Sequence, residues 1–125
     1  MSSVMIIDGA NVVGSVPDGW WRDRAAAAYR LHRCLVDARL STVDRVELVL
    51  EGPARQGVPE STTGSVWVRH ADGLGDDEVI RRACSVVAAG EDLTVVTADR
   101  ALADRIHAIG AEVSPPSALL REIDY

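Results

Sequence analysis

Along the chain, short apolar runs alternate with longer stretches in which apolar residues recur with a helical period. The short runs, rich in β-branched residues, predict strands at 4–7, 46–50, 66–68 and 93–96, and a short edge strand at 112–114. The longer stretches predict helices at 19–40, 76–89 and 101–109, with a last helical turn starting at Ser114-Pro115. Strands that alternate with helices are typical of a mostly parallel sheet covered on both faces.

The length of the chain predicts one domain over residues 1–125, large enough to bury a substantial core. The sequence contains no internal repeat and no low-complexity linker. A polar stretch at 52–64, which contains glycine and proline, is longer than a minimal connection and is a candidate functional loop.

The charged residues exclude several function classes. All 13 basic residues are arginines, so a lysine Schiff base and a Walker A phosphate loop are excluded. The 19 acidic residues give a formal net charge of −6, which argues against nucleic-acid binding through bulk positive charge. The same excess leaves room for a carboxylate cluster that is neutralised by bound metal.

The sequence gives no sign of export or of membrane insertion. The first apolar run is too short for a secretory signal, and no apolar stretch approaches the roughly 18 residues that a membrane span needs. Cys34 and Cys84 both fall in predicted helices and form no metal-binding pair. We therefore expect a cytoplasmic protein without a membrane partner.

Acidic residues follow the predicted strands or open a predicted helix. Asp8, Glu51 and Asp99 come after strands, and Asp76 and Asp77 begin a helix. In an open parallel sheet the carboxyl ends of the strands meet at one edge, where ligands bind. Clustered carboxylates repel one another unless a cation neutralises them, and Mg²⁺ or Mn²⁺ prefers such oxygen ligands. A bound metal of this kind activates water and stabilises phosphoryl transition states.

Each of these acids also has a purely structural interpretation. Asp8 before a glycine can shape a turn. Asp76, Asp77 or Asp99 can cap a helix or favour its dipole, and Glu51 can simply be solvated. The functional interpretation depends on the five residues occurring together.

Three segments carry a resemblance to a known family: Ile7-Asp8-Gly9-Ala10-Asn11-Val12, Gly75-Asp76-Asp77, and Val96-Thr97-Ala98-Asp99-Arg100. In this order they resemble the NYN domain, a branch of the PIN-like nuclease superfamily, and its bacterial YacP-like members in particular. The resemblance implies a three-layer α/β/α, PIN-like, Rossmannoid fold with a central, mostly parallel sheet. It also implies a metal-dependent endoribonuclease that acts on single-stranded RNA.

The resemblance also suggests roles for individual residues. Asp8, Asp76, Asp77 and Asp99 match the acidic metal-site positions and are the candidate catalytic residues, and Asn11 matches a polar residue that braces the first aspartate or contacts phosphate. Our hypothesis is that Asp8, Asp77 and Asp99 hold Mg²⁺ or Mn²⁺, with Asp76 and Glu51 in secondary roles through water. Glu51 stands where relatives often have aspartate. Asp104 is left out of the site because it lies about 100° round the helix from the expected position.

Several residues near these acids are candidates for RNA contact. Arginine forms bidentate hydrogen bonds with phosphate, so Arg22, Arg55 and Arg100 are expected to bind substrate together with Asn11. Arg30 and Arg33 share a helix face with Arg22 that is more simply explained as a solvated face. The adjacent tryptophans at 20 and 21 either stack on bases or pack against the core.

Two other functions remain open from the sequence. One is a non-catalytic RNA-binding or interaction module that keeps the fold, and the other is a metal-dependent nucleotide phosphohydrolase. A homodimer is also compatible with the sequence.

Overall fold

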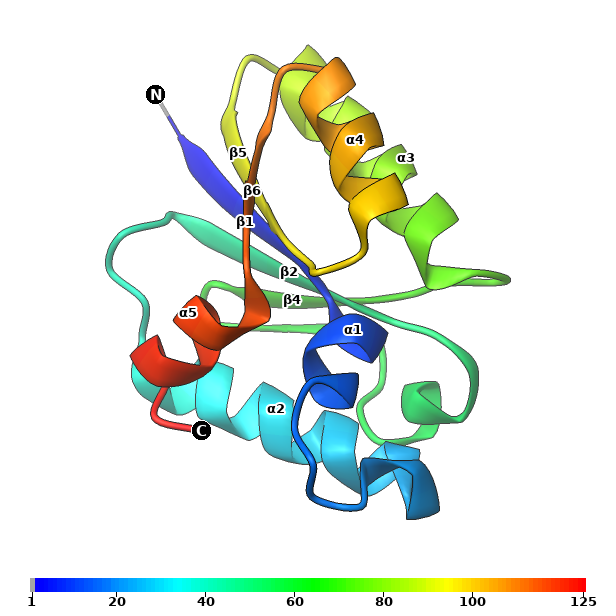
Figure 1. Ribbon diagram of the computed structural model, residues 1–125. Coiled ribbons are helices and arrows are strands. Elements are labelled where there is room, and N and C mark those ends of the chain that lie inside the picture. Colours follow the sequence, from blue (N-terminus) through cyan, green and yellow to red (C-terminus); the bar gives the residue numbers. More distant parts are fainter. Residues whose placement is uncertain (1) are drawn as a thin grey trace.

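The computed structural model describes residues 2–125 and contains a six-stranded sheet between two layers of helices (Figure 1). The strands are β1 (Ser3–Asp8), β2 (Arg45–Leu50), β3 (Ser61–Thr63), β4 (Val66–His70), β5 (Asp92–Val96) and β6 (Glu112–Ser114). The helices are α1 (Gly9–Gly14), α2 (Arg24–Ala38), α3 (Gly75–Ala88), α4 (Arg100–Ala108) and α5 (Pro116–Glu122). The strand order is β3-β4-β2-β1-β5-β6, and every neighbouring pair except β3 and β4 is parallel. The predicted α/β/α fold with a mostly parallel sheet is confirmed.

The sheet separates two hydrophobic cores. Helices α3 and α4 cover one face, and α1, α2 and α5 cover the other (Figure 1). Successive side chains of a strand point to opposite faces, so Ile6 of β1 joins the α3–α4 core and Ile7 joins the α2 core. Burial on both faces explains why the central strands are almost entirely apolar.

The prediction of one continuous helix over residues 19–40 is wrong for its first residues. A 3-10 helix η1 (Trp20–Arg22) precedes α2, and Asp23 separates the two. The side chain of Asp23 accepts a hydrogen bond from the backbone N–H of Ala26 at 2.9 Å, so it caps α2 and fixes its start. At the other end, Arg39 adopts a left-handed conformation with φ of 49°, which ends the helix.

The sequence pattern gave no indication of α1, which begins directly after β1. It has only six residues, too few to show a helical period. Gly9 allows it to lie close to the sheet, because a Cβ there would come within 2.5 Å of the Val49 carbonyl oxygen. The strand therefore passes into a helix without a loop, and Asp8 lies at the junction.

The predicted loop at 52–64 contains more structure than expected. It forms a 3-10 helix, η2 (Gly52–Gln56), and the strand β3, which pairs antiparallel with β4. The three residues of β3 are all serine or threonine, so the apolar pattern could not identify them. Gly57 packs against the backbone of Ala25 in α2, where a Cβ would not fit.

A cluster of ion pairs is buried under α3. Glu47 of β2 is 0% exposed and accepts hydrogen bonds from Arg82 at 2.7 Å and from Arg45 at 2.9 Å. Arg45 also pairs with Glu91 at 3.2 Å. Burial by itself would raise the pKa of Glu47, but the two guanidinium groups outweigh it and hold the pKa below its usual value.

The remaining expectations from composition concern membranes and thiols. In the described part of the chain, no helix combines the length and the apolar character needed to cross a bilayer. Cys34 in α2 is half-buried, Cys84 in α3 is exposed, and both are free thiols. Their predicted placement in helices is confirmed.

Candidate carboxylate site and its neighbouring cavity

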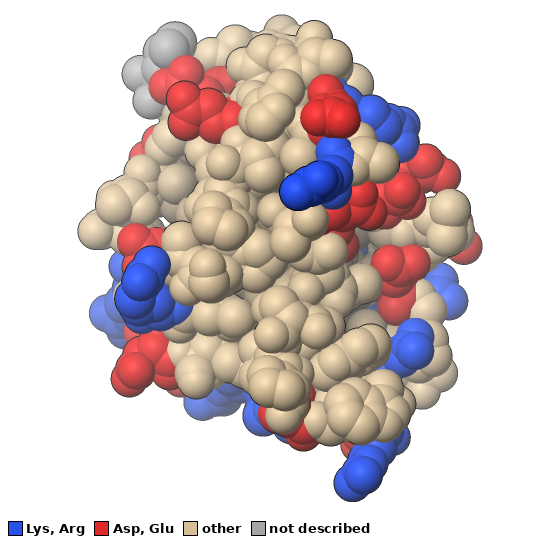
Figure 2. Space-filling view, viewed as in Figure 1, with Lys and Arg blue, Asp and Glu red and all other residues tan. Residues whose placement is uncertain are grey.

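Four of the five predicted acids line one open cavity at the carboxyl edge of the sheet. Asp8 ends β1, Glu51 follows β2, Asp99 follows β5, and Asp76 lies in the first turn of α3. The other lining residues are Ala10, Asn11 and Leu74. Figure 2 shows acidic side chains gathered on the side of the molecule where α3 and α4 begin, with arginines beside them. The convergence expected from strand topology is therefore present for these four residues.

Asp8 is the most buried of the four. Its exposed fraction is 7%, and its Oδ2 accepts a hydrogen bond from the Thr97 hydroxyl at 3.1 Å. The pKa of Asp8 is raised from 3.8 to about 6, mainly by burial and to a smaller extent by the nearby charges of Glu51 and Asp99, while hydrogen bonds from the Thr97 hydroxyl and the Asn11 backbone oppose the increase. A carboxylate held in this way stabilises a positive charge placed beside it.

The segment from Thr97 to Asp99 is held next to Asp8 and α1 by two hydrogen bonds and is braced by a third within it. Asn11 Oδ1 accepts from the backbone N–H of Ala98 at 2.7 Å. Thr97 Oγ1, besides donating to Asp8, accepts from the backbone N–H of Asp99 at 3.1 Å. Asp99 Oδ1 in turn accepts from the N–H of Leu102 at 3.0 Å and caps α4, which leaves Oδ2 outside this cap. For Asp99 the capping interpretation is confirmed, and the same side chain also lines the cavity.

Thr97 is a site residue that sequence reasoning missed. It belongs to the segment that carries the resemblance, but a threonine that ends an apolar strand looks like an ordinary strand residue. Its burial, with 2% exposed, and its double hydrogen bond identify it as the connection between Asp8 and the start of α4.

Replacing Thr97 by valine should raise the pKa of Asp8 above about 6, because the hydrogen bond that favours the ionised form is lost. The free energy of unfolding should fall by about 1–3 kcal/mol at neutral pH, because the buried Asp8 carboxylate loses one donor and the Asp99 N–H loses its acceptor. Carboxyl ¹³C NMR titration and chemical denaturation measure the two effects. Thr97→Ser keeps the hydroxyl and should restore both values; an unchanged Asp8 titration in Thr97→Val contradicts the assignment.

Glu51 reaches the site because α3 begins with a glycine. A Cβ on Gly75 would lie 2.8 Å from Glu51 Oε1, so the carboxylate occupies space that any other residue at position 75 would fill. The side chain therefore lies against the start of α3, where the helix dipole favours negative charge. The longer side chain of glutamate does not keep it out of the cavity.

The structure separates Asp76 from Asp77. Asp76 lines the cavity, and its Oδ1 accepts a hydrogen bond from the N–H of Asp77 at 3.0 Å. The Asp77 side chain is 70% exposed, does not line the cavity, and lies 3.8 Å from the guanidinium of Arg105 in α4. Neighbouring residues of a helix point about 100° apart, which agrees with Asp76 facing the cavity and Asp77 facing Arg105.

Of the four predicted substrate-binding residues, only Asn11 lines the carboxylate cavity. Arg55 donates hydrogen bonds to the carbonyl oxygens of Gly52 and Ala71 at 3.1 and 3.3 Å. Arg100 is exposed at the first position of α4, beside Asp99. Arg22 lies outside the cavity, with its guanidinium 5.8 Å from the centre of the Trp21 ring.

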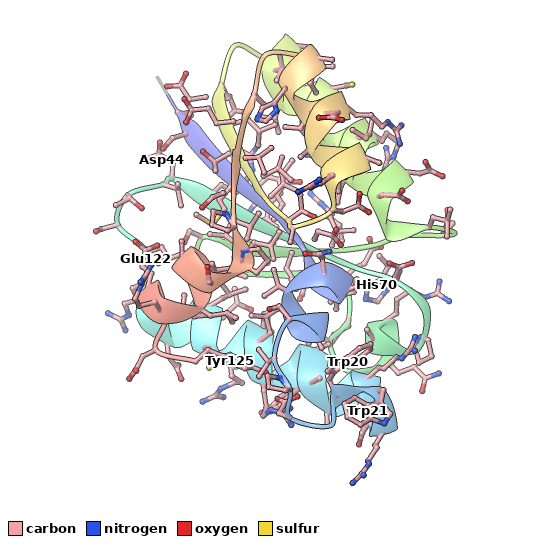
Figure 3. All side chains as sticks on the ribbon, in the orientation of Figure 1. Trp20, Trp21, Asp44, His70, Glu122 and Tyr125 are labelled. Atoms are coloured by element: carbon pink, nitrogen blue, oxygen red, sulfur yellow. The ribbon has the colours of Figure 1, made fainter. Side chains whose placement is uncertain are left out.

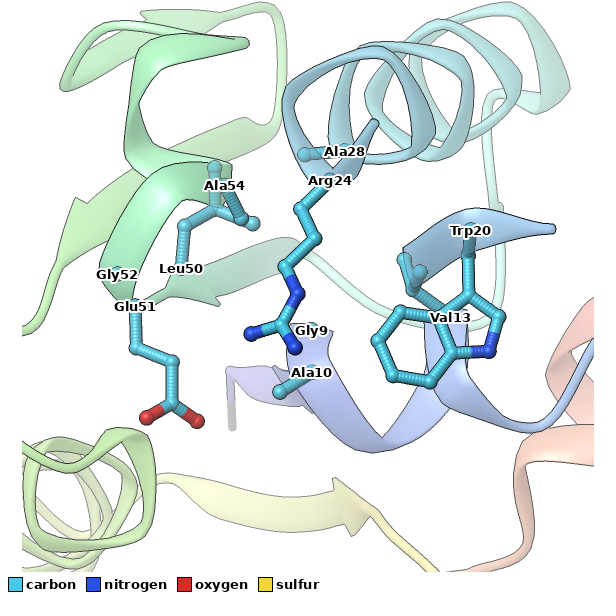
Figure 4. Close-up of a pocket in the computed structure, with 10 residues that line it drawn as sticks. All are labelled: Gly9, Ala10, Val13, Trp20, Arg24, Ala28, Leu50, Glu51, Gly52 and Ala54. Atoms are coloured by element: carbon cyan, nitrogen blue, oxygen red, sulfur yellow. The ribbon is translucent and has the colours of Figure 1, made fainter. Parts of the chain in front are cut away.

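A second cavity adjoins the carboxylates (Figure 4). It lies between α1, α2 and η2, has a volume of about 230 Å³, and shares Ala10 and Glu51 with the first. Trp20 lines it, whereas Trp21 is 56% exposed at the edge of the molecule (Figure 3). The two tryptophans thus differ: Trp20 is half-buried and packs against the α2 core. Arg24, which sequence reasoning did not consider, extends into this cavity (Figure 4).

The donor set fits a hydrated divalent cation. The cavity is lined by four carboxylates, whose oxygens are the kind of ligand that Mg²⁺ and Mn²⁺ prefer, and Asp8 is buried at a cost that a cation would relieve. Among residues 2–125, no three acidic, histidine or cysteine side chains converge closely enough to hold an ion by direct contact alone. Mg²⁺ commonly keeps several waters and binds through one or two carboxylates, so the arrangement suits that mode of binding.

Comparisons with known proteins identify the fold. No family model and no curated protein sequence matches the chain. Solved structures do match, among them Rae1 (YacP) from Bacillus subtilis, with a TM-score of 0.77 at 21% identity, and its W164L mutant, with 0.75 at 20%. The matches cover 98% of this chain and 74% and 75% of those chains, respectively. The chain therefore has a YacP-like fold.

Proposed function

We propose that the protein is a metal-dependent endoribonuclease that acts on single-stranded RNA. The observation that supports this most strongly is the set of four carboxylates around one open cavity at the carboxyl edge of the sheet. The resemblance of the sequence to NYN domains and the YacP-like fold agree with it. A site built only to hold phosphate would not collect acids at this edge, nor bury Asp8 where its ionised form is disfavoured.

In this proposal, Asp8, Asp76 and Asp99 bind Mg²⁺ or Mn²⁺ directly or through water, and Glu51 positions water. The hypothesis from the sequence made Asp77 a metal ligand. We now propose Asp76 in that role, because Asp76 lines the cavity and Asp77 faces Arg105. The bound cation would supply activation of water and charge stabilisation at the scissile phosphate. Thr97 keeps Asp8 in place, Asn11 holds the segment before α4, and Arg100 contacts the RNA backbone.

Wild-type protein should cut an end-labelled, unstructured RNA at internal positions in Mg²⁺ or Mn²⁺, and EDTA should stop the reaction. Loss of a residue that only orients a metal ligand typically costs about 10–100-fold, so we expect Asp76→Asn to cost at least about 100-fold. Asp77→Asn should cost less, because its side chain is exposed outside the cavity. Gel analysis of cleavage products under single-turnover conditions measures both variants.

The same assay separates the other two functions. Release of phosphate or pyrophosphate from a nucleoside triphosphate, with the RNA left intact, would show a nucleotide phosphohydrolase. RNA binding without cleavage in either metal would show a binding module, and both results contradict the proposal. A larger loss in Asp77→Asn than in Asp76→Asn would contradict the choice of ligands.

A further inference from the structure

The second cavity combines apolar walls with one indole ring, one guanidinium group and, at the border with the first cavity, the Glu51 carboxylate. Its lining residues are Gly9, Ala10, Val13, Trp20, Arg24, Ala28, Leu50, Glu51, Gly52 and Ala54. The volume of about 230 Å³ is below the roughly 300–1,000 Å³ of pockets that enclose a whole drug-sized ligand. The cavity therefore suits a single planar ring system better than a complete metabolite.

Arg24 places a guanidinium group beside the Trp20 ring in this cavity. Its Cζ lies 5.4 Å from the centre of the Trp20 ring, and Figure 4 shows the guanidinium between Trp20 and Glu51. None of the ion pairs found in residues 2–125 involves Arg24. A planar guanidinium next to an indole ring can stack on a base and donate hydrogen bonds to its edge.

The position of the cavity relates it to the carboxylates. Ala10 and Glu51 line both cavities, so a ligand that occupied one would reach the border of the other. A strand with a phosphate at the carboxylates would place an adjacent base at this border. The ring of Trp20 is held in place by its packing against α1 and the α2 core, which prepares a surface for stacking.

We infer that this cavity binds one nucleobase next to the scissile phosphate, with Trp20 and Arg24 as the recognising residues. The inference rests on the proposed function for the identity of the strand. It assigns to Arg24 a contact with the base, which distinguishes it from arginines that contact only phosphate. Base binding here would make cleavage depend on the nucleotide beside the cut.

Fluorescence of Trp20 tests this directly. The chain has three tryptophans, so a Trp21→Phe/Trp67→Phe variant leaves Trp20 as the sole indole. In Mg²⁺ buffer, and again in EDTA, we titrate the four nucleoside 5′-monophosphates, with ribose 5-phosphate as the control without a base. We expect saturable quenching by at least one nucleotide and none by ribose 5-phosphate.

Two substitutions in this background locate the binding. Stacking and hydrogen bonding of one base contribute enough that Arg24→Gln should raise the Kd at least about fivefold. Ala54→Leu fills the cavity without removing a polar group and should abolish quenching. Arg33→Gln, an exposed arginine of the same helix that lines neither cavity, should leave the Kd unchanged.

RNA cleavage by the same variants separates this inference from the proposed function. Quenching that depends on Arg24, without cleavage of any RNA, supports the base site and overturns the nuclease. Cleavage that Ala54→Leu and Arg24→Gln leave unchanged, without quenching of Trp20, supports the nuclease and overturns the base site. Absence of both overturns both. Equal quenching by ribose 5-phosphate, or an equal effect of Arg33→Gln, also overturns the base site.

Discussion

Replacement of Asp8 by asparagine should abolish metal-dependent RNA cleavage and at the same time stabilise the metal-free protein. The ionised carboxylate is disfavoured in the folded state, where the pKa of Asp8 is about 6 rather than 3.8. At a pH well above 6 this difference corresponds to about 3 kcal/mol of lost stability, which the neutral asparagine would recover. Asparagine also keeps an oxygen that can accept the Thr97 hydrogen bond.

The stability that Asp8→Asn gains over the wild type should increase with pH. Well below pH 4 Asp8 is protonated in both the folded and the unfolded state, so the two proteins should differ little. As the pH rises from 4 to 6 the unfolded chain loses its proton and the folded protein keeps it, so the wild type loses stability relative to the variant. At a pH well above 6, where Asp8 is ionised in both states, the difference should stay constant.

Urea denaturation across this pH range, with and without Mg²⁺ or Mn²⁺, measures the effect. The metal should stabilise the wild type and leave Asp8→Asn unchanged. Asp104→Asn is the matched control, since Asp104 is an exposed carboxylate of α4 outside the cavity. Cleavage by Asp8→Asn at the wild-type rate, or a variant less stable than the wild type at pH 7, would contradict the assignment of Asp8.

Much of the fold could be predicted because burial on both faces leaves a clear pattern in the sequence. Strands β1, β2 and β5 are almost continuous apolar runs, and each lies within two residues of its predicted bounds. The segments that were missed are short or polar, such as α1 and β3, and are stabilised by tertiary contacts. Gly9 against the Val49 carbonyl is one of these contacts, and no periodicity in the sequence indicates it.

The sequence could also predict which residues after the strands lie together at the candidate site, but not how every side chain there is oriented. The carboxyl edge of a parallel sheet fixes where residues after a strand lie, which explains why Asp8, Glu51 and Asp99 share a cavity. The sequence cannot tell which of two adjacent helix residues faces that edge, so Asp76 and Asp77 were not distinguished. The role of Arg24 depends on the break between η1 and α2, which the helical pattern did not reveal.

Two buried carboxylates of the same sheet, Asp8 and Glu47, have opposite pKa shifts because their neighbouring charges differ. Within residues 2–125, Asp8 has no arginine partner and its pKa is raised, whereas Glu47 has two arginine partners and its pKa is lowered. A buried acid without a cation beside it is costly, and such costs are typical of binding and catalytic sites. Glu47 is satisfied within the fold, so we assign it a structural role.

Replacement of Arg82 by methionine should therefore be strongly destabilising while leaving the candidate site intact. Methionine keeps much of the volume of the side chain but removes the hydrogen bonds at 2.7 and 3.0 Å that neutralise the buried Glu47 carboxylate. Removing one partner of a buried ion pair typically costs about 3–5 kcal/mol, because the other charge stays buried. A second arginine, Arg45, still contacts Glu47, which favours the lower part of this range.

The adjacent residue provides the control. Arg81 pairs with Glu78 at the surface with 70% of its side chain exposed, so Arg81→Met should change the stability little. Urea denaturation at pH 7 compares the two variants. Adding Glu47→Gln to Arg82→Met should recover part of the loss by removing the buried charge, which Arg45 alone neutralises only in part. Equal stability of the Arg81 and Arg82 variants would contradict a structural role for the buried pair. So would a double variant less stable than Arg82→Met, because the loss in Arg82→Met could then not come from the incompletely neutralised charge on Glu47.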